Sequence, residues 1–323
     1  MTDVQAVPIA IPPGYQAVIV ILEEDGLRGL GEAPVVPGRG GSLETLLQEL
    51  RQGRPGTASA RCALQTAHCD LEARRRGVPL AELLGGRRRT SIECSALITD
   101  LRPEAVAREV ERRSALGFGS FKLKAAPSAE LDQERLGAAR WAAGAGARLR
   151  VDFNGRLRIE QAGSRLARLE GFGVELFEQP LPAGAGLGEW RRLKACTSAA
   201  LAADESLADP STAEDLARAG VALALKLATV GGPSAALDLA RHACAAVTIG
   251  SSMETSIGIA AALHVACALP ERPLPCGLAT TEALAGDLAC GLLWQGPTVE
   301  LPNAPGIGVE LDQRALDAYR LDR

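Results

Sequence analysis

The chain has 323 residues, 47% of them apolar, which is enough to bury one large core and a smaller second unit. Its formal net charge of −4 gives no electrostatic reason to expect a nucleic acid or an anionic membrane as a partner. No apolar run approaches the roughly 20 residues that span a bilayer, and the first residues lack the basic start and apolar stretch of a signal peptide. We therefore expect a cytoplasmic protein.

Cysteine and histidine are placed in a way that argues against a zinc or redox centre. The eight cysteines include no C-x-x-C pair, so we interpret most of them as small buried residues in a reducing compartment. The three histidines all fall within helix-like segments. A histidine-based metal site or catalytic dyad is therefore not expected.

Residues 1–90 predict a small α+β unit. Its predicted strands are Val4–Ile11, Tyr15–Glu23 and Leu27–Glu32, and the turn Pro12-Pro13-Gly14 joins the first two. Helices are predicted at Ser42–Arg51, Ser59–Arg76 and Pro79–Leu84. Ser42 and Ser59 are the predicted N-caps of the first two, and Gly77 follows the second as its stop.

From Ser91 the pattern changes to alternating strands and helices. The predicted strands are Glu93–Ile98, Gly119–Lys124, Ala147–Asp152, Gly173–Glu178, Ala199–Asp204, Val221–Lys226, Ala245–Gly250 and Leu274–Gly277. The predicted helices between them are Pro103–Leu116, Ala129–Ala143, Ile159–Leu169, Leu187–Ala195, Ser211–Ala219, Pro233–Cys244 and Thr255–Leu269. Right-handed crossovers between so many strands make a closed parallel barrel the simplest architecture. After the eighth strand we expect a last helix at Glu282–Cys290, and then a tail, Pro297–Arg323, that returns to the N-terminal unit.

Charged residues stand at the ends of five successive predicted strands. These residues are Lys122 and Lys124, Asp152, Glu178, Asp204, and Lys226. The intervals from Lys124 onward are 28, 26, 26 and 22 residues, and each suits one strand, one helix and two turns. In a parallel barrel the carboxyl ends of the strands meet at one mouth, where the active site lies. We therefore expect three carboxylates in the middle of that mouth, with ammonium groups on both flanks.

This combination favours metal-assisted proton abstraction. Three clustered carboxylates need a divalent cation, and ligation by oxygen alone favours Mg²⁺ (or Mn²⁺). Such an ion polarises a substrate carboxylate and acidifies the adjacent C–H, while a lysine nearby acts as the base. A Schiff-base aldolase would gain nothing from the carboxylates. A barrel that binds an acidic metabolite without turnover is the non-enzymatic alternative.

The motifs K-x-K, D-x-N, E-Q-P, D-E-S and K-x-x-x-x-G-G resemble, in this order and spacing, the enolase superfamily and its muconate-lactonizing subgroup. The resemblance implies an α/β protein, a modified (β/α)7β TIM-type barrel with an α+β capping domain. The capping domain would comprise residues 1–90 plus roughly 291–323, and the barrel residues 91–290.

The resemblance also implies roles for individual residues. Asp152, Glu178 and Asp204 would bind Mg²⁺. Lys124 would be the acid/base on one face, Lys226 the second acid/base or an electrostatic stabiliser opposite, and Lys122 would steady the metal-bound carboxylate of the substrate. Polar partners behind the metal ligands would be Asn154 and Glu205. The histidine–aspartate dyad of the mandelate racemase subgroup is absent from the sequence.

Two segments resemble o-succinylbenzoate synthases within this subgroup. The first is Gly250–Thr255, where Ser251, Ser252 and Met253 would contact the substrate, and the second is Cys276–Thr280. Dipeptide epimerases usually carry a D-x-D pair at the second segment, and this chain has no acid there. The short turn Pro12-Pro13-Gly14 departs from the longer loop that usually closes over the substrate.

The leading hypothesis is therefore a syn-dehydration that gives o-succinylbenzoate for menaquinone synthesis. An N-acylamino acid racemase, a dipeptide epimerase and a muconate cycloisomerase-like enzyme are the alternatives. The expected partner is a small-molecule carboxylate, and the sequence leaves the exact substrate, the stereochemistry and the oligomeric state open, a homo-oligomer included.

Overall fold

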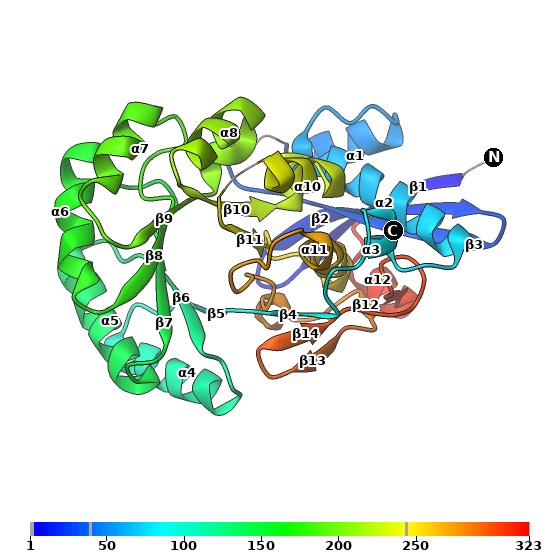
Figure 1. Ribbon diagram of the computed structural model, residues 1–323. Helices are drawn as coiled ribbons and strands as arrows, with labels where there is room; N and C mark the ends of the chain where they lie inside the picture. The colour runs from blue at the N-terminus through cyan, green and yellow to red at the C-terminus, as the bar shows by residue number, and fades with distance from the viewer. Residues whose placement is uncertain (1–2, 39–40, 243–244, 323) are drawn as a thin grey trace.

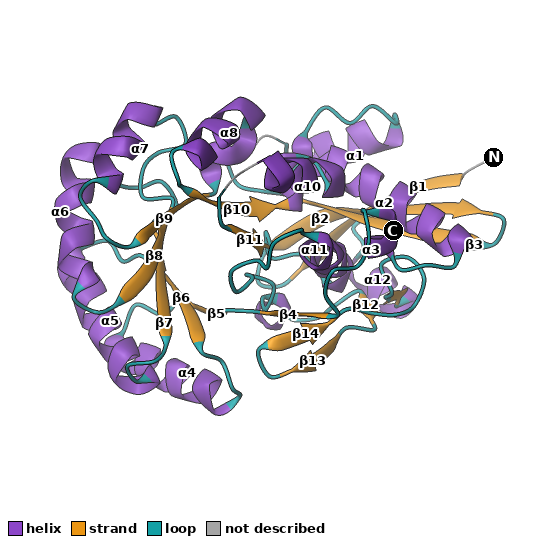
Figure 2. Ribbon diagram, viewed as in Figure 1, coloured by secondary structure: helices purple, strands orange, loops and turns teal. Residues whose placement is uncertain are grey.

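The computed structural model describes residues 3–38, 41–242 and 245–322. Figure 1 shows two parts, a ring of parallel strands with helices outside it and a second part in which the first strands and the end of the chain lie together. Figure 2 shows the same arrangement by element type, with the helices α5 to α8 forming the outer wall. The barrel and its mouth therefore dominate the architecture.

An antiparallel sheet opens the chain in the order β1-β2-β3. Its strands are β1 (Asp3–Ile11), β2 (Tyr15–Glu24) and β3 (Leu27–Pro34), and the helices α1 (Leu43–Arg51), α2 (Ala58–Arg76) and α3 (Leu80–Leu83) follow. Strand β3 lies so close to α2 that a Cβ at Gly31 would be 1.9 Å from the carbonyl oxygen of Ala63. Only glycine permits this approach.

The predicted helix caps are right in one case and wrong in the other. The side chain of Ser42 accepts a hydrogen bond from the backbone N–H of Thr45, which confirms it as the N-cap of α1. Thr57, not Ser59, caps α2. The Ser59 hydroxyl instead donates to the carbonyl oxygen of Pro34, 2.7 Å away, and so ties α2 to the end of β3.

The parallel barrel confirms the predicted fold class. Within the described ranges its sheet runs in chain order through β5 (Ala96–Ile98), β6 (Ser120–Lys124), β7 (Arg148–Asp152), β8 (Val174–Glu178), β9 (Ala200–Ala203), β10 (Ala222–Lys226) and β11 (Val247–Gly250). The segment 274–277 closes the ring, because parallel bridges join Cys276 to Cys94 and Gly277 to Gly250. The backbone N–H groups of Cys276 and Gly277 each donate across these seams at 2.8 Å.

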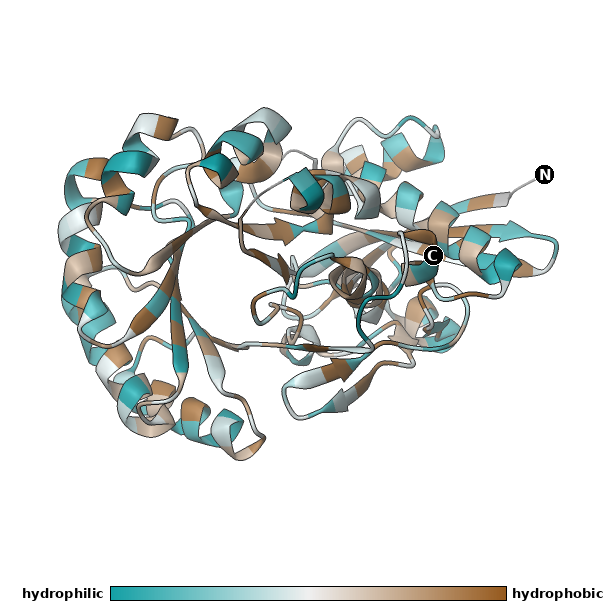
Figure 3. Cartoon of the chain, in the orientation of Figure 1, coloured by the Kyte–Doolittle hydropathy of each residue, from teal (hydrophilic) through white to brown (hydrophobic). Residues whose placement is uncertain are grey.

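Helices follow the barrel strands as the alternation predicts. They are α4 (Pro103–Ala115), α5 (Ala129–Ala143), α6 (Ile159–Glu170), α7 (Leu187–Lys194), α8 (Pro210–Arg218), α9 (Leu227–Val230), α10 (Pro233–His242) and α11 (Ser256–Ala268), with a 3₁₀ turn at Glu205–Ala208. The end of the predicted helix Pro233–Cys244 lies outside the described residues. Alternating polar and apolar stretches mark the outer helices in Figure 3, as expected of helices that pack one face on the barrel. Among the described helices, none combines the length and apolar character that a membrane crossing requires.

The segment after the eighth strand differs from the prediction. Instead of a helix at Glu282–Cys290, the chain forms a 3₁₀ turn at Thr281–Ala283 and then strand β12 (Ala289–Cys290). The position of Gly286 leaves no room for a side chain, because a Cβ there would lie 2.1 Å from the Tyr319 hydroxyl. The carboxylate of Asp287 accepts hydrogen bonds from the backbone N–H and the hydroxyl of Ser256, at the start of α11. These contacts hold the segment in an extended form.

The C-terminal residues contact the first sheet and one strand near the barrel. Their elements are β13 (Leu293–Gln295), β14 (Thr298–Glu300), β15 (Glu310–Leu311) and α12 (Gln313–Tyr319). The predicted strand Glu93–Ile98 is divided, because β4 (Ser91–Glu93) pairs with β14 while only β5 joins the barrel. Arg320 bridges to Ile9 of β1, and the N–H of Leu321 donates to the carbonyl of Pro8. These contacts support the predicted capping domain, which remains a prediction as a folding unit.

Candidate active site

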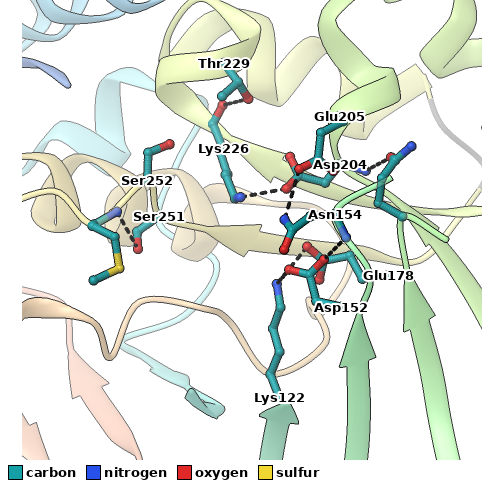
Figure 4. A network of polar contacts seen from close by, with 12 residues as sticks. Lys122, Asp152, Asn154, Glu178, Asp204, Glu205, Lys226, Thr229, Ser251 and Ser252 are labelled. Carbon is teal, nitrogen blue, oxygen red and sulfur yellow. Dashed lines mark hydrogen bonds and ion pairs between the residues drawn. The ribbon is translucent and has the colours of Figure 1, made fainter. Parts of the chain in front are cut away.

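The charged residues that follow the barrel strands lie together at one end of the barrel. Strand register aligns Lys124 with Asp152 and Asp152 with Glu178, so the ends of β6, β7 and β8 are level. Asp204 directly follows β9, and Lys226 is the last residue of β10. In Figure 4 the side chains of Asp152, Glu178 and Asp204 point into one region, with Lys122 and Lys226 entering it from different strands.

Ion pairs connect the acids to all three lysines. The Lys122 ammonium nitrogen lies 2.9 Å from Asp152 Oδ2 and 2.7 Å from Glu178 Oε1. The Lys124 nitrogen is also 2.7 Å from Asp152 Oδ2, and the Lys226 nitrogen is 2.6 Å from Asp204 Oδ2. Three negative charges are therefore matched by three positive ones.

Burial and charge shift the pKa values of this cluster in opposite directions. Burial raises the pKa of Asp152, but the ammonium groups of Lys122 and Lys124 outweigh it and hold that pKa well below its usual range. Glu178 is different, because burial and repulsion from the two aspartates raise its pKa despite the opposing effect of Lys122. A divalent cation among these carboxylates would oppose the mutual repulsion that raises the pKa of Glu178.

The donor set fits Mg²⁺ in its chemistry. Carboxylate oxygens are the ligands that this hard ion prefers, and the side chains of Asp152 and Asp204 are fully buried. In the described part of the chain, however, no set of three or more His, Cys, Asp or Glu side chains is arranged to hold a metal ion as it stands. The lysine ammonium groups are the partners of the carboxylates in this structure, and Lys122 is the cation that Asp152 and Glu178 share.

Asn154 and Glu205 lie next to this cluster. The side-chain oxygen of Asn154 accepts from the Lys124 ammonium at 3.0 Å, while its amide nitrogen donates to Glu205 Oε1 at 3.1 Å. The backbone N–H of Asn154 donates to Asp152 Oδ1. Asn154 therefore fixes both an acid and a lysine, and the structure brings both residues into the polar network.

Gln179 holds two strand ends together, a role that sequence reasoning missed. Its side chain is buried and accepts from the backbone N–H groups of Asp204, at 2.8 Å, and Ser206, at 3.2 Å. Its amide nitrogen donates to the carbonyl of Leu181 and to the Ser206 hydroxyl. The amide thus positions Asp204 relative to Glu178. The signal in the sequence is the E-Q-P motif, which places this amide directly after the predicted strand Gly173–Glu178.

Backbone strain is concentrated around this mouth. Among the described residues four that are not glycine have a positive φ, and three of them follow barrel strands: Asn154 at 47°, Gln179 at 39° and Met253 at 71°. Such conformations cost energy for residues with a side chain and cluster at functional sites. Their position supports the assignment of this end of the barrel as the working end.

A cavity of about 880 Å³ opens over the cluster. Its lining includes Lys122, Lys124, Glu178 and Lys226, together with the predicted substrate-binding residues Ser251, Ser252 and Met253. Val36, Pro37 and Gly38 also line it, so the segment that follows β3 contributes to the wall. Thr280, which was assigned no role, lines the cavity as well and shares a 2.7 Å hydrogen bond with the hydroxyl of Ser251.

Glu254 lies behind this cavity rather than in its lining. It is buried beside Glu32 of β3, and burial together with repulsion from Glu32 raises the pKa of Glu254 to about 7. Glu32 itself accepts hydrogen bonds from the Tyr15 hydroxyl and from the N–H groups of Thr255 and Gly258. This buried pair therefore joins the first sheet to the start of α11.

Comparison with known proteins identifies the family. A model described as "Enolase C-terminal domain-like" matches residues 105–315. The chain belongs to the enolase superfamily. It is 34% identical over 299 residues to a chloromuconate cycloisomerase of Pseudomonas putida, a match that covers 87% of this chain and 78% of the relative.

Other relatives have different activities. An L-Ala-D/L-Glu epimerase of Bacillus subtilis is 30% identical, over 82% of this chain and 74% of the relative. An o-succinylbenzoate synthase of Thermobifida fusca is 36% identical, over 62% of this chain and 63% of the relative. The crystal structure of a muconate cycloisomerase from Pseudomonas fluorescens superposes with a TM-score of 0.92 at 26% identity, covering 99% of this chain and 98% of that one. These matches confirm the predicted superfamily and fold, and they make the protein an enzyme of the lyase or isomerase type.

Proposed function

We propose that this enzyme removes a proton α to a carboxylate of a small-molecule substrate, assisted by Mg²⁺ (or Mn²⁺) bound to Asp152, Glu178 and Asp204. The observation that carries the proposal is the gathering of these buried acids at the ends of β7, β8 and β9, with lysines of β6 and β10 on either side. The ion, when bound, would supply a Lewis acid for the substrate carboxylate.

The lysines differ in a way that suits different roles. The Lys124 side chain is 32% exposed and Lys226 only 16%, so Lys124 is the more accessible of the two from the cavity. Burial lowers the pKa of Lys226, but Asp204 outweighs it, and the net shift favours the ammonium form. We therefore assign Lys124 as the base that takes the α-proton and Lys226 as the cation that stabilises the developing negative charge. Lys122, held between Asp152 and Glu178, would steady the substrate carboxylate.

For the specific reaction we propose dehydration to o-succinylbenzoate, a step of menaquinone synthesis. Lys124 would remove the α-proton and then return it to the departing hydroxyl, so that water leaves from one face. The likeness to the Thermobifida fusca o-succinylbenzoate synthase supports this assignment. So does the end of the eighth strand, where Gly277, Leu278 and Ala279 offer no acid for a substrate ammonium group.

The direct test is turnover of the cyclohexadiene precursor by purified protein with Mg²⁺, followed by ultraviolet absorbance and identification of the product. We expect conversion by the wild type, loss of activity in Lys124→Ala, and full activity in Arg191→Ala, which changes an exposed residue of α7. No conversion by the wild type would reject the dehydration.

Racemisation or epimerisation of an N-acylamino acid or dipeptide is the second candidate, because the two flanking lysines would allow proton transfer on both faces. The likeness to the Bacillus subtilis epimerase favours it. Incubation in D₂O tests it by nuclear magnetic resonance, since an epimerase exchanges the α-hydrogen of its substrate. No exchange across a library of N-acylamino acids and dipeptides would reject this candidate.

A further inference from the structure

The segment Ser251–Met253 forms part of the cavity wall, and the side chain of Glu254 holds it from behind. The backbone N–H of Ser252 donates to the Glu254 carboxylate, and Met253, between these two residues, has a φ of 71°. A residue with a side chain adopts this left-handed conformation at a cost in energy, so contacts around it must maintain it. Ser251 is fixed by bonds to the end of the eighth strand. The other end of the wall depends on Glu254.

A second acid, Glu32 of β3, lies beside Glu254. Gly258 makes this approach possible, because a Cβ there would lie 2.5 Å from the Cβ of Glu254 and 3.0 Å from Glu32 Oε2. Both acids are buried, and the free space next to them is about 10 Å³, room for one water molecule at most. Bulk water therefore does not screen one carboxyl group from the other.

The hydrogen bonds of Glu32 and Glu254 decide which of the two stays ionised. Glu32 accepts from four donors, which are the Tyr15 hydroxyl, the N–H and the hydroxyl of Thr255, and the N–H of Gly258. Burial raises the pKa of Glu32, and the four bonds oppose it because they favour the carboxylate. Glu254 accepts from the backbone N–H of Ser252 and from its own. The negative charge is thus better stabilised on Glu32, and the proton belongs to Glu254.

The other titratable groups that face Glu254 come from three elements. They are Lys226 of β10, Cys62 of α2 and Tyr15 of β2. Burial is the main cause that raises the pKa of Cys62 and of Tyr15, and Asp287 adds to the effect on Tyr15. The thiol and the phenol are therefore neutral near pH 7.

Lys226 remains as the cation that faces Glu254. Its side chain passes Gly250, where a Cβ would lie 3.4 Å from Lys226 Cγ. Gly250 lines both the small space beside Glu254 and the large cavity. An ionised Glu254 would be repelled by Glu32 and attracted towards Lys226, and so towards the cavity.

We propose that Glu254 is a positioning residue that, as the neutral acid, holds the wall Ser251–Met253 in place and, on ionisation, displaces it. Glu32 is fixed by four donors on a sheet strand, so the part that moves is the segment attached to Glu254. The pKa of Glu254, raised to about 7 by burial and by Glu32, puts this change near neutral pH. The inference rests on the proposed function only in taking this cavity as the substrate site.

A methionine in the wall provides a probe that needs no substrate. The sequence has two methionines, Met1 and Met253, so protein labelled with ¹³C at the methionine methyl groups gives a simple spectrum. A Met253→Leu variant identifies the signal of the wall. We expect this signal in the wild type to move in one step with a midpoint near pH 7. Glu254→Gln keeps an acceptor for the Ser252 N–H but cannot ionise, so its signal should stay where the wild type has it at low pH.

A soluble paramagnetic agent separates displacement of the wall from a mere change of charge nearby. It broadens a methyl signal according to exposure, so the broadening of Met253 should differ between low and high pH in the wild type and be constant in Glu254→Gln. Glu160→Gln, which changes an exposed acid of α6, should behave as the wild type does. Glu32→Gln should lower the midpoint, because the repulsion between the two acids is removed.

Histidines titrate in the same range, so dependence on Glu254 identifies the group. A Met253 signal that does not move between about pH 5 and pH 9, or that moves equally in Glu254→Gln, would overturn the inference. Equal broadening at both pH values, or an unchanged midpoint in Glu32→Gln, would also overturn it. A titration as expected in a protein that does not dehydrate the precursor would reject the proposed reaction only.

Discussion

Replacing Gln179 by leucine tests whether this amide holds the ends of β8 and β9. The substitution keeps the size of the side chain but removes the acceptor for the N–H groups of Asp204 and Ser206 and the donor to the carbonyl of Leu181. The Ser206 hydroxyl keeps a partner, the carbonyl oxygen of Ala183. Three buried backbone groups are left unsatisfied, at about 1 to 3 kcal/mol each. Leucine recovers about 1 to 2 kcal/mol by apolar burial. We expect a net loss of about 1 to 8 kcal/mol in the free energy of unfolding.

Urea denaturation followed by circular dichroism measures this loss. The matched control is Gln161→Leu, which changes an exposed glutamine on α6 and should lie within about 0.5 kcal/mol of the wild type. Gln179→Leu should also raise the Mg²⁺ concentration needed for activity, because Asp204 loses the anchor on its backbone. A loss of stability below about 1 kcal/mol would refute the reasoning, since unsatisfied buried groups on this scale cannot cost so little.

Three further substitutions test other parts of the structure. The pKa of Glu254, raised from 4.5 to about 7 by burial and Glu32, means that the wild type loses up to about 3 kcal/mol of stability as the pH rises through this interval. Denaturation of Glu254→Gln should therefore show it more stable than the wild type at pH 8 and equal to it at pH 4; a constant difference would contradict this. Burial lowers the pKa of His264 from 6.5 to about 4, so stability is full above 6.5 and falls by up to about 3 kcal/mol as the pH drops to 4. His264→Asn should lack this part of the acid sensitivity, and an unchanged slope between pH 7 and 4 would count against it. Gly31→Ala places a Cβ 1.9 Å from the Ala63 carbonyl oxygen and should cost about 3 kcal/mol by thermal denaturation, whereas Gly146→Ala meets nothing within 4 Å and serves as its control. Equal melting temperatures for these two variants would show that β3 and α2 separate freely.

The barrel could be predicted because its signals are local and repeated. Charged residues stand at the ends of five successive strands, β6 to β10, and the interval from each to the next leaves room for one helix. The observed order of strands follows the chain without exception from β5 to β11. Gly77 stops α2 in a left-handed conformation at φ 67°, as its position in the sequence predicts. The order of the barrel strands and the end of α2 can therefore be predicted from neighbouring residues alone.

The parts that failed depend on partners distant in the chain. Glu93 pairs with Thr298 of the C-terminal hairpin. The sequence around Glu93 does not indicate that this residue leaves the barrel strand and pairs with a distant hairpin. The carboxylate of Asp287 accepts a hydrogen bond from the backbone N–H of Ser256 at the start of α11. This contact with a distant element favours an extended segment at 282–290 over the predicted helix. The role of Gln179 is equally hidden, because its acceptors and donors belong to another strand end. A single sequence does not show which remote group will meet a given polar side chain.

In the candidate active site, too, the sequence predicts what depends on local signals and not what depends on contacts between distant residues. The sequence intervals place the acids and lysines together, and the resemblance supplies their roles. The ion pairs among them emerge only from the folded geometry.

Binding of Mn²⁺ measured by electron paramagnetic resonance tests the central claim most directly. The account predicts one tightly bound ion per chain in the wild type, and its loss in each of Asp152→Asn, Glu178→Gln and Asp204→Asn. Asp238→Asn, which changes an exposed residue of α10, should bind the ion as the wild type does. Undiminished binding in any of the three acid variants, or no binding by the wild type, would contradict the proposed metal site.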